Sequence, residues 1–363
     1  MTPNDAVLKA PANNFTAVRL LLASLVIFTH SYWLTTGTSG KDDLSDILGA
    51  PVSVFAVDGF FFLSGFLVYP SLLRLGRASR FLLARLARLW PGLAVSVLLT
   101  ALAGAFISSV HGLAYLRGDT AKFLATNLTF LVGSFNLTGV TCGAAACPVN
   151  GSLWTLPWEA RCYLALALLG VLGLAKPDLM KLFVLPATLV GAIVWDIPAL
   201  QHFVQVHVGH GAVDQLNEAD RLWPLFALGA AAYIFRDRLT LSWIVLSGLF
   251  VVMLVANRLG VGVHARALFV GYLVLCLGLL TAKTRSFSGT WPDYSYGMYI
   301  YAFPVMMAVH ALAPTPSHWV LAAMTFAATL PCAVMSWHFI EKPALGAAKQ
   351  ARAKTPVPAP QGV

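Results

Sequence analysis

The stretch Phe15-Thr-Ala-Val-Arg19-Leu-Leu-Leu-Ala-Ser-Leu-Val-Ile-Phe-Thr-His30 opens the apolar part of the chain and predicts both fold and chemistry. It forms most of a membrane-spanning helix, yet it carries two ionisable side chains, Arg19 and His30. Their spacing is close to a whole number of helical turns, so they share one face, about 16 Å apart along the axis. Ionisable residues inside a span are costly and usually face a polar interior. The pair therefore predicts a polar track that enters the membrane.

The composition of the whole chain is that of an integral membrane protein. Of its 363 residues, 58% are hydrophobic and 11% are charged, whereas a soluble domain carries about 25% charged residues. The apolar runs are long and continuous, which indicates helices rather than a β-barrel. We expect an all-α integral membrane protein with about ten transmembrane helices of ~20 residues each. The expected spans are 15–35, 51–73, 90–110, 152–174, 182–197, 221–235, 240–257, 266–282, 294–313 and 318–338.

The basic residues behind the net charge of +9 lie mainly in alternate short loops. This distribution follows the positive-inside rule and predicts that both termini are cytoplasmic. We expect a multi-pass protein of a bacterial-type cytoplasmic (inner) membrane, with no cleavable signal peptide. No long basic arm is present, so we expect no nucleic-acid partner. Residues 1–343 are predicted to form a single transmembrane domain, and the Ala/Pro/Lys-rich residues 344–363 a disordered cytoplasmic tail.

Two of the five cysteines, Cys142 and Cys147, share a Gly/Ala-rich loop. A disulfide between them is expected if that loop is extracytoplasmic. No His or third Cys lies nearby in sequence, so we expect no metal site.

His30 is the first catalytic candidate, because a neutral imidazole accepts a proton near neutral pH and suits a general base. The alternative is a hydrogen bond to a neighbouring helix. Asp58 enters the second span from its outer end at a depth similar to that of His30. A carboxylate at that depth fixes the tautomer of an imidazole, although a purely structural pairing of Asp58 stays open. Ser64 and Gly65 are small and admit close approach by another helix or by a ligand.

Arg85 and Arg88 are three residues apart and share one face of an expected interfacial helix that ends near Pro91. Such a pair suits phosphate recognition. Anchoring to lipid headgroups is the alternative, and spacing alone favours it.

The segment from Asn150 to Tyr163 opens the fourth span from outside. Glu159 lies at roughly the depth of Asp58 and His30, and we expect it to be functional. Trp154 and Trp158 fit either an interfacial aromatic belt or stacking on a sugar. With Tyr163 they are the candidates for substrate binding.

Taken together over about residues 14–343, these segments resemble the acyltransferase 3 family of multispan membrane enzymes. The resemblance rests on the order and spacing of several motifs, namely Arg19-x10-His30, Phe61-Phe-Leu-Ser-Gly65, Arg85-x-x-Arg88, Ser152-Leu-Trp-Thr-Leu-Pro-Trp-Glu159 and Tyr294-Ser-Tyr-Gly-Met-Tyr299. It implies transfer of an acyl group, usually acetyl, from cytoplasmic acyl-CoA to a hydroxyl. Acceptors in that family are typically sugars of surface glycans and sometimes other small molecules.

The resemblance implies that the family's histidine and basic residue correspond to His30 and Arg19, and its basic pair to Arg85 and Arg88. Our hypothesis for the mechanism builds on this correspondence. Arg85 and Arg88 hold the CoA phosphates, and the pantetheine arm passes Ser64 and Arg19. His30 is the general base, oriented by Glu159 or Asp58; a covalent acyl-His intermediate is the rival route. Acetyl-CoA is the expected acyl donor. A transporter or glycan flippase without acyl transfer is the competing class, because it explains intramembrane charges equally well.

Overall fold

The structure is a computed structural model, which describes residues 13–131, 134–142, 145–146, 148–284 and 290–354. Its described part is helical apart from two two-residue strands, β1 (Thr141–Cys142) and β2 (Ala145–Ala146). This confirms the prediction of a helical membrane protein. The first half contains the helices α2 (Phe15–Thr36), α3 (Ser45–Leu48), α4 (Val52–Leu75), α5 (Ala78–Ile107), η1 (Gly112–Ala114), α6 (Asp119–Leu128), η2 (Gly151–Thr155) and α7 (Leu156–Val171). The second half contains α8 (Pro177–Leu179), η3 (Met180–Val184), α9 (Leu185–Trp195), α10 (Pro198–His207), α11 (His210–Ile234), α12 (Trp243–Arg258), α13 (Gly262–Leu275), η4 (Cys276–Leu280), α14 (Thr281–Thr284), α15 (Ser295–Leu312), α16 (His318–Ser336), η5 (Trp337–Glu341) and α17 (Lys342–Lys354).

Six helices among the described residues are long and apolar enough to cross a membrane. They are Phe15–Thr36, Val52–Leu75, Ala78–Ile107, Pro177–Trp195, Gly262–Leu280 and His318–Ala353. The other predicted spans also coincide with helices, but these are shorter or more polar; α12, for example, is apolar and has 16 residues. The count of ten spans and the cytoplasmic placement of the termini therefore stay predictions.

Two predicted boundaries were wrong. Arg85 and Arg88 do not lie on a separate interfacial helix, because α5 continues through Pro91 without a break; membrane helices tolerate such prolines where neighbouring groups satisfy the freed backbone. The tail is not disordered from residue 344, since α17 continues the last helix to Lys354. Residues 355–363 of the predicted tail lie outside the described residues, as does Cys147 of the possible disulfide.

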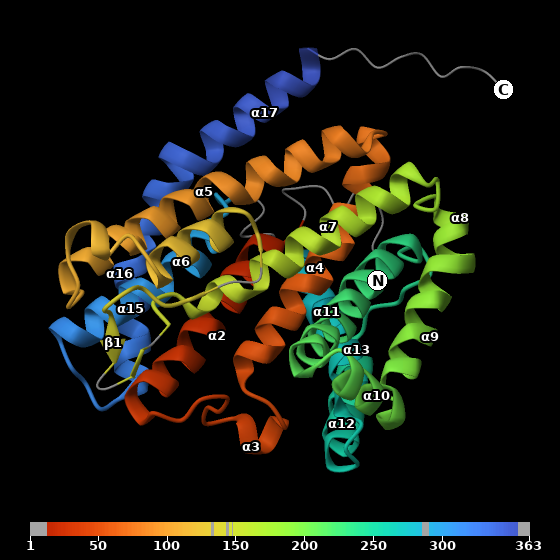
Figure 1. Cartoon of the computed structure of the whole chain (residues 1–363). Helices are drawn as coiled ribbons and strands as arrows, with labels where there is room; N and C mark the ends of the chain where they lie inside the picture. Colours follow the sequence, from red (N-terminus) through yellow and green to blue (C-terminus); the bar gives the residue numbers. More distant parts are fainter. Residues whose placement is uncertain (1–12, 132–133, 143–144, 147, 285–289, 355–363) are drawn as a thin grey trace.

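Helix α4 lies at the centre of the fold (Figure 1). On one side it packs against α2, which in turn packs against α15 and α16. On the other side it packs against α11 and α13. The crossing of α4 and α11 is unusually close, because a Cβ on Gly65 would overlap the carbonyl oxygen of Phe226, and a Cβ on Gly229 would overlap that of Phe62. Small residues permit this approach of two membrane helices, and Gly65 is thus a helix contact.

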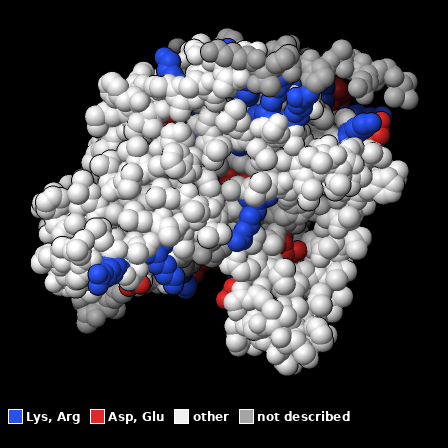
Figure 2. All heavy atoms as spheres, turned by 45° about the horizontal axis from the view of Figure 1, so that its top comes forward, with Lys and Arg blue, Asp and Glu red and all other residues white. Residues whose placement is uncertain are grey.

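The outer surface of the molecule carries few charges over wide areas (Figure 2). Leu102 on α5, Leu168 on α7 and Leu189 on α9 are each 57–62% exposed. Exposed apolar side chains on long apolar helices are expected where a protein faces lipid rather than water. The polar and charged residues of the candidate site lie inside.

Candidate active site

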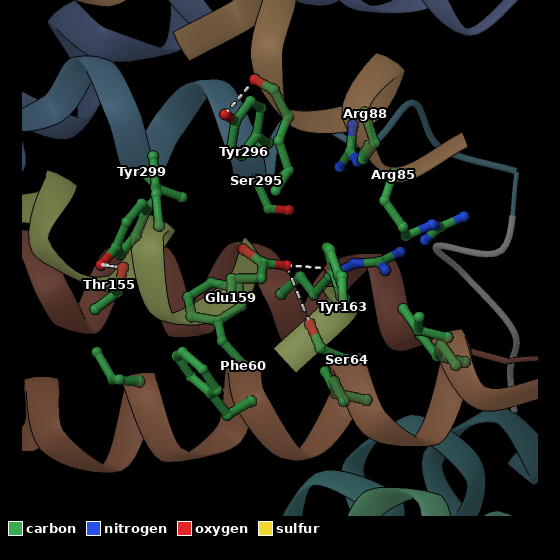
Figure 3. A pocket seen from close by; sticks show the side chains of 18 residues that line it. Phe60, Ser64, Arg85, Arg88, Thr155, Glu159, Tyr163, Ser295, Tyr296 and Tyr299 are labelled. Atoms are coloured by element: carbon green, nitrogen blue, oxygen red, sulfur yellow. Dashed lines mark hydrogen bonds between the residues drawn. The ribbon is translucent and has the colours of Figure 1, made fainter. Parts of the chain in front are cut away.

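A cavity of about 140 Å³ lies between the central helix α4 and helices α2, α5, α7 and α15. Five side chains predicted from the sequence line it together, and Figure 3 shows it from close by. Those five are Arg19, Ser64, Arg85, Arg88 and Glu159, and the substrate-binding candidate Tyr163 lines it as well. These side chains come from helices that lie far apart in the sequence and meet at the cavity.

Glu159 lies near the middle of the cavity and is fixed by two hydrogen bonds (Figure 3). The hydroxyl of Ser64 on α4 donates to Oε1 at 3.2 Å. The hydroxyl of Tyr163, one helical turn further along α7, donates to the same oxygen. Glu159 is thereby held as an oriented carboxylate facing the cavity. Its hydrogen-bond partners are Ser64 and Tyr163 rather than His30, and its catalytic role stays a prediction.

The two arginines of α5 differ in their surroundings. Arg88 donates from Nη1 to Glu341 at 2.9 Å and from Nη2 to Asp293 at 2.7 Å. Asp293 also pairs with Arg19 at 3.3 Å, so one carboxylate joins two arginines of the cavity. Hydrogen bonds from Ser295 and Ser336 hold Asp293 and Glu341 in turn.

Arg85 has no such carboxylate within the described part of the chain. Its guanidinium lies 5.9 Å from the ring centre of Phe81 and 6.0 Å from that of Tyr163, while its buried Nε has no hydrogen-bond partner. A desolvated cation that lacks a hydrogen-bond acceptor is unfavourable unless an anion binds to it. Arg85 thus has hydrogen-bonding capacity left for an anionic ligand, and it has no carboxylate partner in the described part of the chain, whereas Arg19 and Arg88 pair with Asp293.

His30 lies beyond the opposite end of the cavity from the arginines. It lines an adjoining narrow crevice, and its ring meets that of Phe303 edge-on at 5.0 Å. Tyr299 lines both the cavity and this crevice, and a hydrogen bond of 2.7 Å joins its hydroxyl to that of Thr155. Tyr299 therefore separates His30 from Glu159. The predicted common face of α2 is present, since Arg19 reaches Asp293 just before α15, and His30 packs on α15 itself.

Asp58 lies away from His30 in a buried ionic cluster. Its carboxylate, 1% exposed, accepts from Arg221 at 2.8 Å and from Arg266 at 2.8 Å. This cluster ties α4 to α11 and α13. These contacts support the alternative that Asp58 pairs with polar partners for structural reasons. No contact in the described structure supports the prediction that Asp58 orients His30.

Trp154 and Trp158 do not line the cavity within the described structure; each packs on an arginine. The guanidinium of Arg161 lies 4.2 Å from the Trp158 ring, and that of Arg221 lies 6.0 Å from the Trp154 ring. Their assignment to substrate binding stays a prediction.

Sequence reasoning missed the ionic partners. None of the four partners, Asp293, Glu341, Arg221 and Arg266, is among the candidate site residues predicted from the sequence. Arg266 carried the clearest sequence signal of a buried ion pair, because it stands in an otherwise apolar run. In the structure it is 8% exposed.

A comparison with protein-family models places this chain in a known family. The family model described as "Acyltransferase domain" matches residues 13–338. Nodulation protein 10 of Rhizobium leguminosarum bv. viciae is 26% identical over 376 residues, covering 95% of this chain and 96% of its own length. The O-acetyl transferase of Shigella phage Sf6 is 26% identical over 351 residues, covering 91% of this chain and 95% of its own. No solved structure matches the chain. The chain belongs to the acyltransferase 3 family and is an acyltransferase.

Proposed function

We propose that this chain is a membrane O-acyltransferase that moves an acetyl or similarly short acyl group from acyl-CoA to a hydroxyl of a sugar or glycan. The similar protein of phage Sf6 is named an O-acetyl transferase, which supports oxygen as the accepting atom. The observation that carries the proposal is the row of groups from Arg85 through Ser64 and Glu159 to Tyr299, with His30 just beyond. Acyl-CoA is a long substrate, so its binding site needs an anion-binding group where the phosphates lie and a base where the thioester lies.

The donor binds with its phosphates at Arg85. That guanidinium has donors to spare, and Arg–phosphate pairs are strong and bidentate. Arg88 is already held by Asp293 and Glu341, so it fixes the end of α5 and adds positive charge. The pantetheine arm then runs past Ser64 and Glu159. Because Arg74, Arg77 and Arg80 cluster where α4 ends and α5 begins, the donor enters from the cytoplasm.

Transfer takes place at His30. The imidazole removes the proton of the acceptor hydroxyl, whose oxygen attacks the thioester carbonyl; the CoA sulfur leaves and takes the proton from the imidazolium. Attack by His30 itself, with an acyl-His intermediate, is the two-step alternative. In either route Tyr299 turns away from Thr155 to let the thioester through. In this proposal Glu159, which also accepts hydrogen bonds from Ser64 and Tyr163, orients the imidazole once Tyr299 has turned away.

A short acyl group is supported by the crevice beside His30. It is narrow, and its walls include Ala302, Phe303 and Met306. Apolar walls suit the methyl group of acetyl, and a long acyl chain would have to displace them. The acceptor reaches His30 from the side of the membrane opposite the donor.

The test is release of CoA from acetyl-CoA by purified protein in detergent, with a panel of sugars as acceptors. We expect the His30→Ala variant to lose at least about 100-fold in rate, the scale of general acid–base catalysis. His264→Ala is the matched control, since His264 is half exposed and pairs with Asp196 away from the cavity. Thermal unfolding checks that both variants fold.

Full activity in the His30→Ala variant would remove His30 from the mechanism. Absence of CoA release from the wild-type protein with every donor and acceptor tried would favour the transporter or flippase.

A further inference from the structure

A second and larger cavity lies on the other side of α7 from the active site. It is a groove of about 700 Å³ between α7, the α8–α9 segment and α11. In Figure 1 α7 runs across the middle of the molecule toward the upper right, where the chain turns at α8 and returns along α9 at the right edge. The walls include Leu168 of α7, Ala187 and Gly191 of α9, and Trp223 of α11.

The groove offers an apolar surface. Both indole N–H groups in its walls are already used, since Trp195 donates to Asn217 at 2.9 Å and Trp223 donates to Thr188 at 3.1 Å. Asp220, at the end near Trp195, is the one charged side chain among the lining residues. A ligand that fills the groove must therefore be mostly hydrocarbon.

The surroundings of the groove indicate where that hydrocarbon comes from. The helix Pro177–Trp195 is a candidate membrane span of which only 17% is buried inside the protein. Leu182, Leu189 and Leu168 beside the groove are 57–65% exposed. These side chains face lipid, so the groove opens into the hydrocarbon of the bilayer. From Val184 to Trp195 it extends about 16 Å along the helix, close to the depth of one leaflet of a ~30 Å hydrocarbon core.

The end of the groove near Leu174 is basic. Lys176 is exposed two residues beyond Leu174, and Lys181 follows on the next turn, partly balanced by Asp178 at 3.2 Å. Ammonium groups at a membrane surface attract anionic lipid headgroups. The apolar groove suits the acyl chain of an amphiphilic ligand, and the basic rim suits its anionic headgroup.

We propose that the groove between α7, α9 and α11 binds an acyl chain of an anionic phospholipid, with the lipid phosphate near Lys176. The site is separate from the proposed catalytic cavity and does not depend on it.

The test uses the two tryptophans of the wall as reporters. The full-length protein in detergent is titrated with phosphatidylglycerol whose acyl chains are brominated, because bromine quenches indole fluorescence on contact. We expect saturable quenching in the wild-type protein and a smaller amplitude in the Trp223→Phe variant. Phosphatidylcholine with the same brominated chains is expected to bind about tenfold more weakly, and Lys176→Glu to reduce that preference.

Two variants block the groove. A Cβ added at Gly191 meets no atom within 4 Å, so Gly191→Phe fills the groove without a backbone clash. Ala187→Phe places a second ring in the same wall. Gly248 on α12 is the matched control, since a Cβ there also meets nothing within 4 Å and Gly248 does not line the groove.

We expect both blocking variants to weaken lipid binding by about tenfold or more, with Gly248→Phe unchanged. Equal quenching curves for Gly191→Phe, Ala187→Phe and Gly248→Phe would overturn the proposal. Unsaturable quenching, or equal binding of the two lipids by the wild-type protein, would do so as well.

Discussion

Arg85 and Arg88 show how far the surroundings decide what a residue does. They are the same residue type on the same face of one helix, yet Arg88 has two carboxylate partners and the buried Nε of Arg85 has none. Of the two arginines in this motif, Arg88 is therefore bound into the fold by its carboxylate partners, and Arg85 is the one we propose to bind a ligand.

Substitution of each arginine separates these roles. We expect Arg88→Ala to destabilise the protein by about 3–5 kcal/mol, because it leaves Glu341, 1% exposed, as an unpaired buried carboxylate. Arg85→Ala removes no salt bridge and is expected to keep the melting temperature within a few degrees while raising KM for acyl-CoA about tenfold. Thermal unfolding in detergent and donor kinetics measure the two effects.

The double variant Arg88→Ala/Glu341→Gln is the control for the first effect, since it removes the carboxylate that would be left unpaired. It should regain part of the lost stability. Similar melting temperatures for Arg85→Ala and Arg88→Ala would contradict the division of roles.

The central crossing of α4 and α11 is the feature that matters most among the helices. Ser64 and Gly65 are neighbours on α4, but Ser64 faces Glu159 in the cavity and Gly65 faces the backbone of α11. The same short segment thus positions a cavity residue and sets the distance between two helices.

Gly65→Ala tests this crossing. Alanine normally favours a helix over glycine, but here its Cβ would overlap the carbonyl oxygen of Phe226. We expect a loss of about 1–3 kcal/mol, the usual cost of overpacking, measured as a lower melting temperature. Gly248→Ala, which meets nothing within 4 Å, should be neutral or slightly stabilising. An unchanged melting temperature for Gly65→Ala would mean that the two helices are free to move apart.

At the scale of the whole molecule, the direction of insertion decides which side supplies the donor. The arginines around the junction of α4 and α5 and the lysines after α7 predict one side as cytoplasmic. Cysteines introduced by Lys41→Cys and Lys176→Cys test this in intact cells. A membrane-impermeant maleimide should label the first, in the loop between α2 and α4, and not the second. The reverse pattern would invert the topology and place the arginine end of the cavity outside.

Much of the architecture was predictable because it depends on local periodicity. Long apolar runs predicted the helices, and helical spacing placed Arg19 and His30 on one face of α2 and Arg85 with Arg88 on one face of α5. These conclusions need only 3.6 residues per turn. Ser64 and Glu159 were also predicted as site residues, each from its own motif and without the contact between them.

The partners of these residues were decided by the tertiary structure. Asp58 was predicted to orient His30, yet its partners are Arg221 and Arg266, 163 and 208 positions further along the chain. Arg88 and its partner Glu341 are 253 positions apart in the sequence, and Ser64 and its partner Glu159 are 95 positions apart. A sequence gives the face and the depth of a side chain on its own helix. Which helix lies opposite depends on how closely the backbones approach, and in this protein that approach is set where Gly65 and Gly229 let α4 and α11 touch.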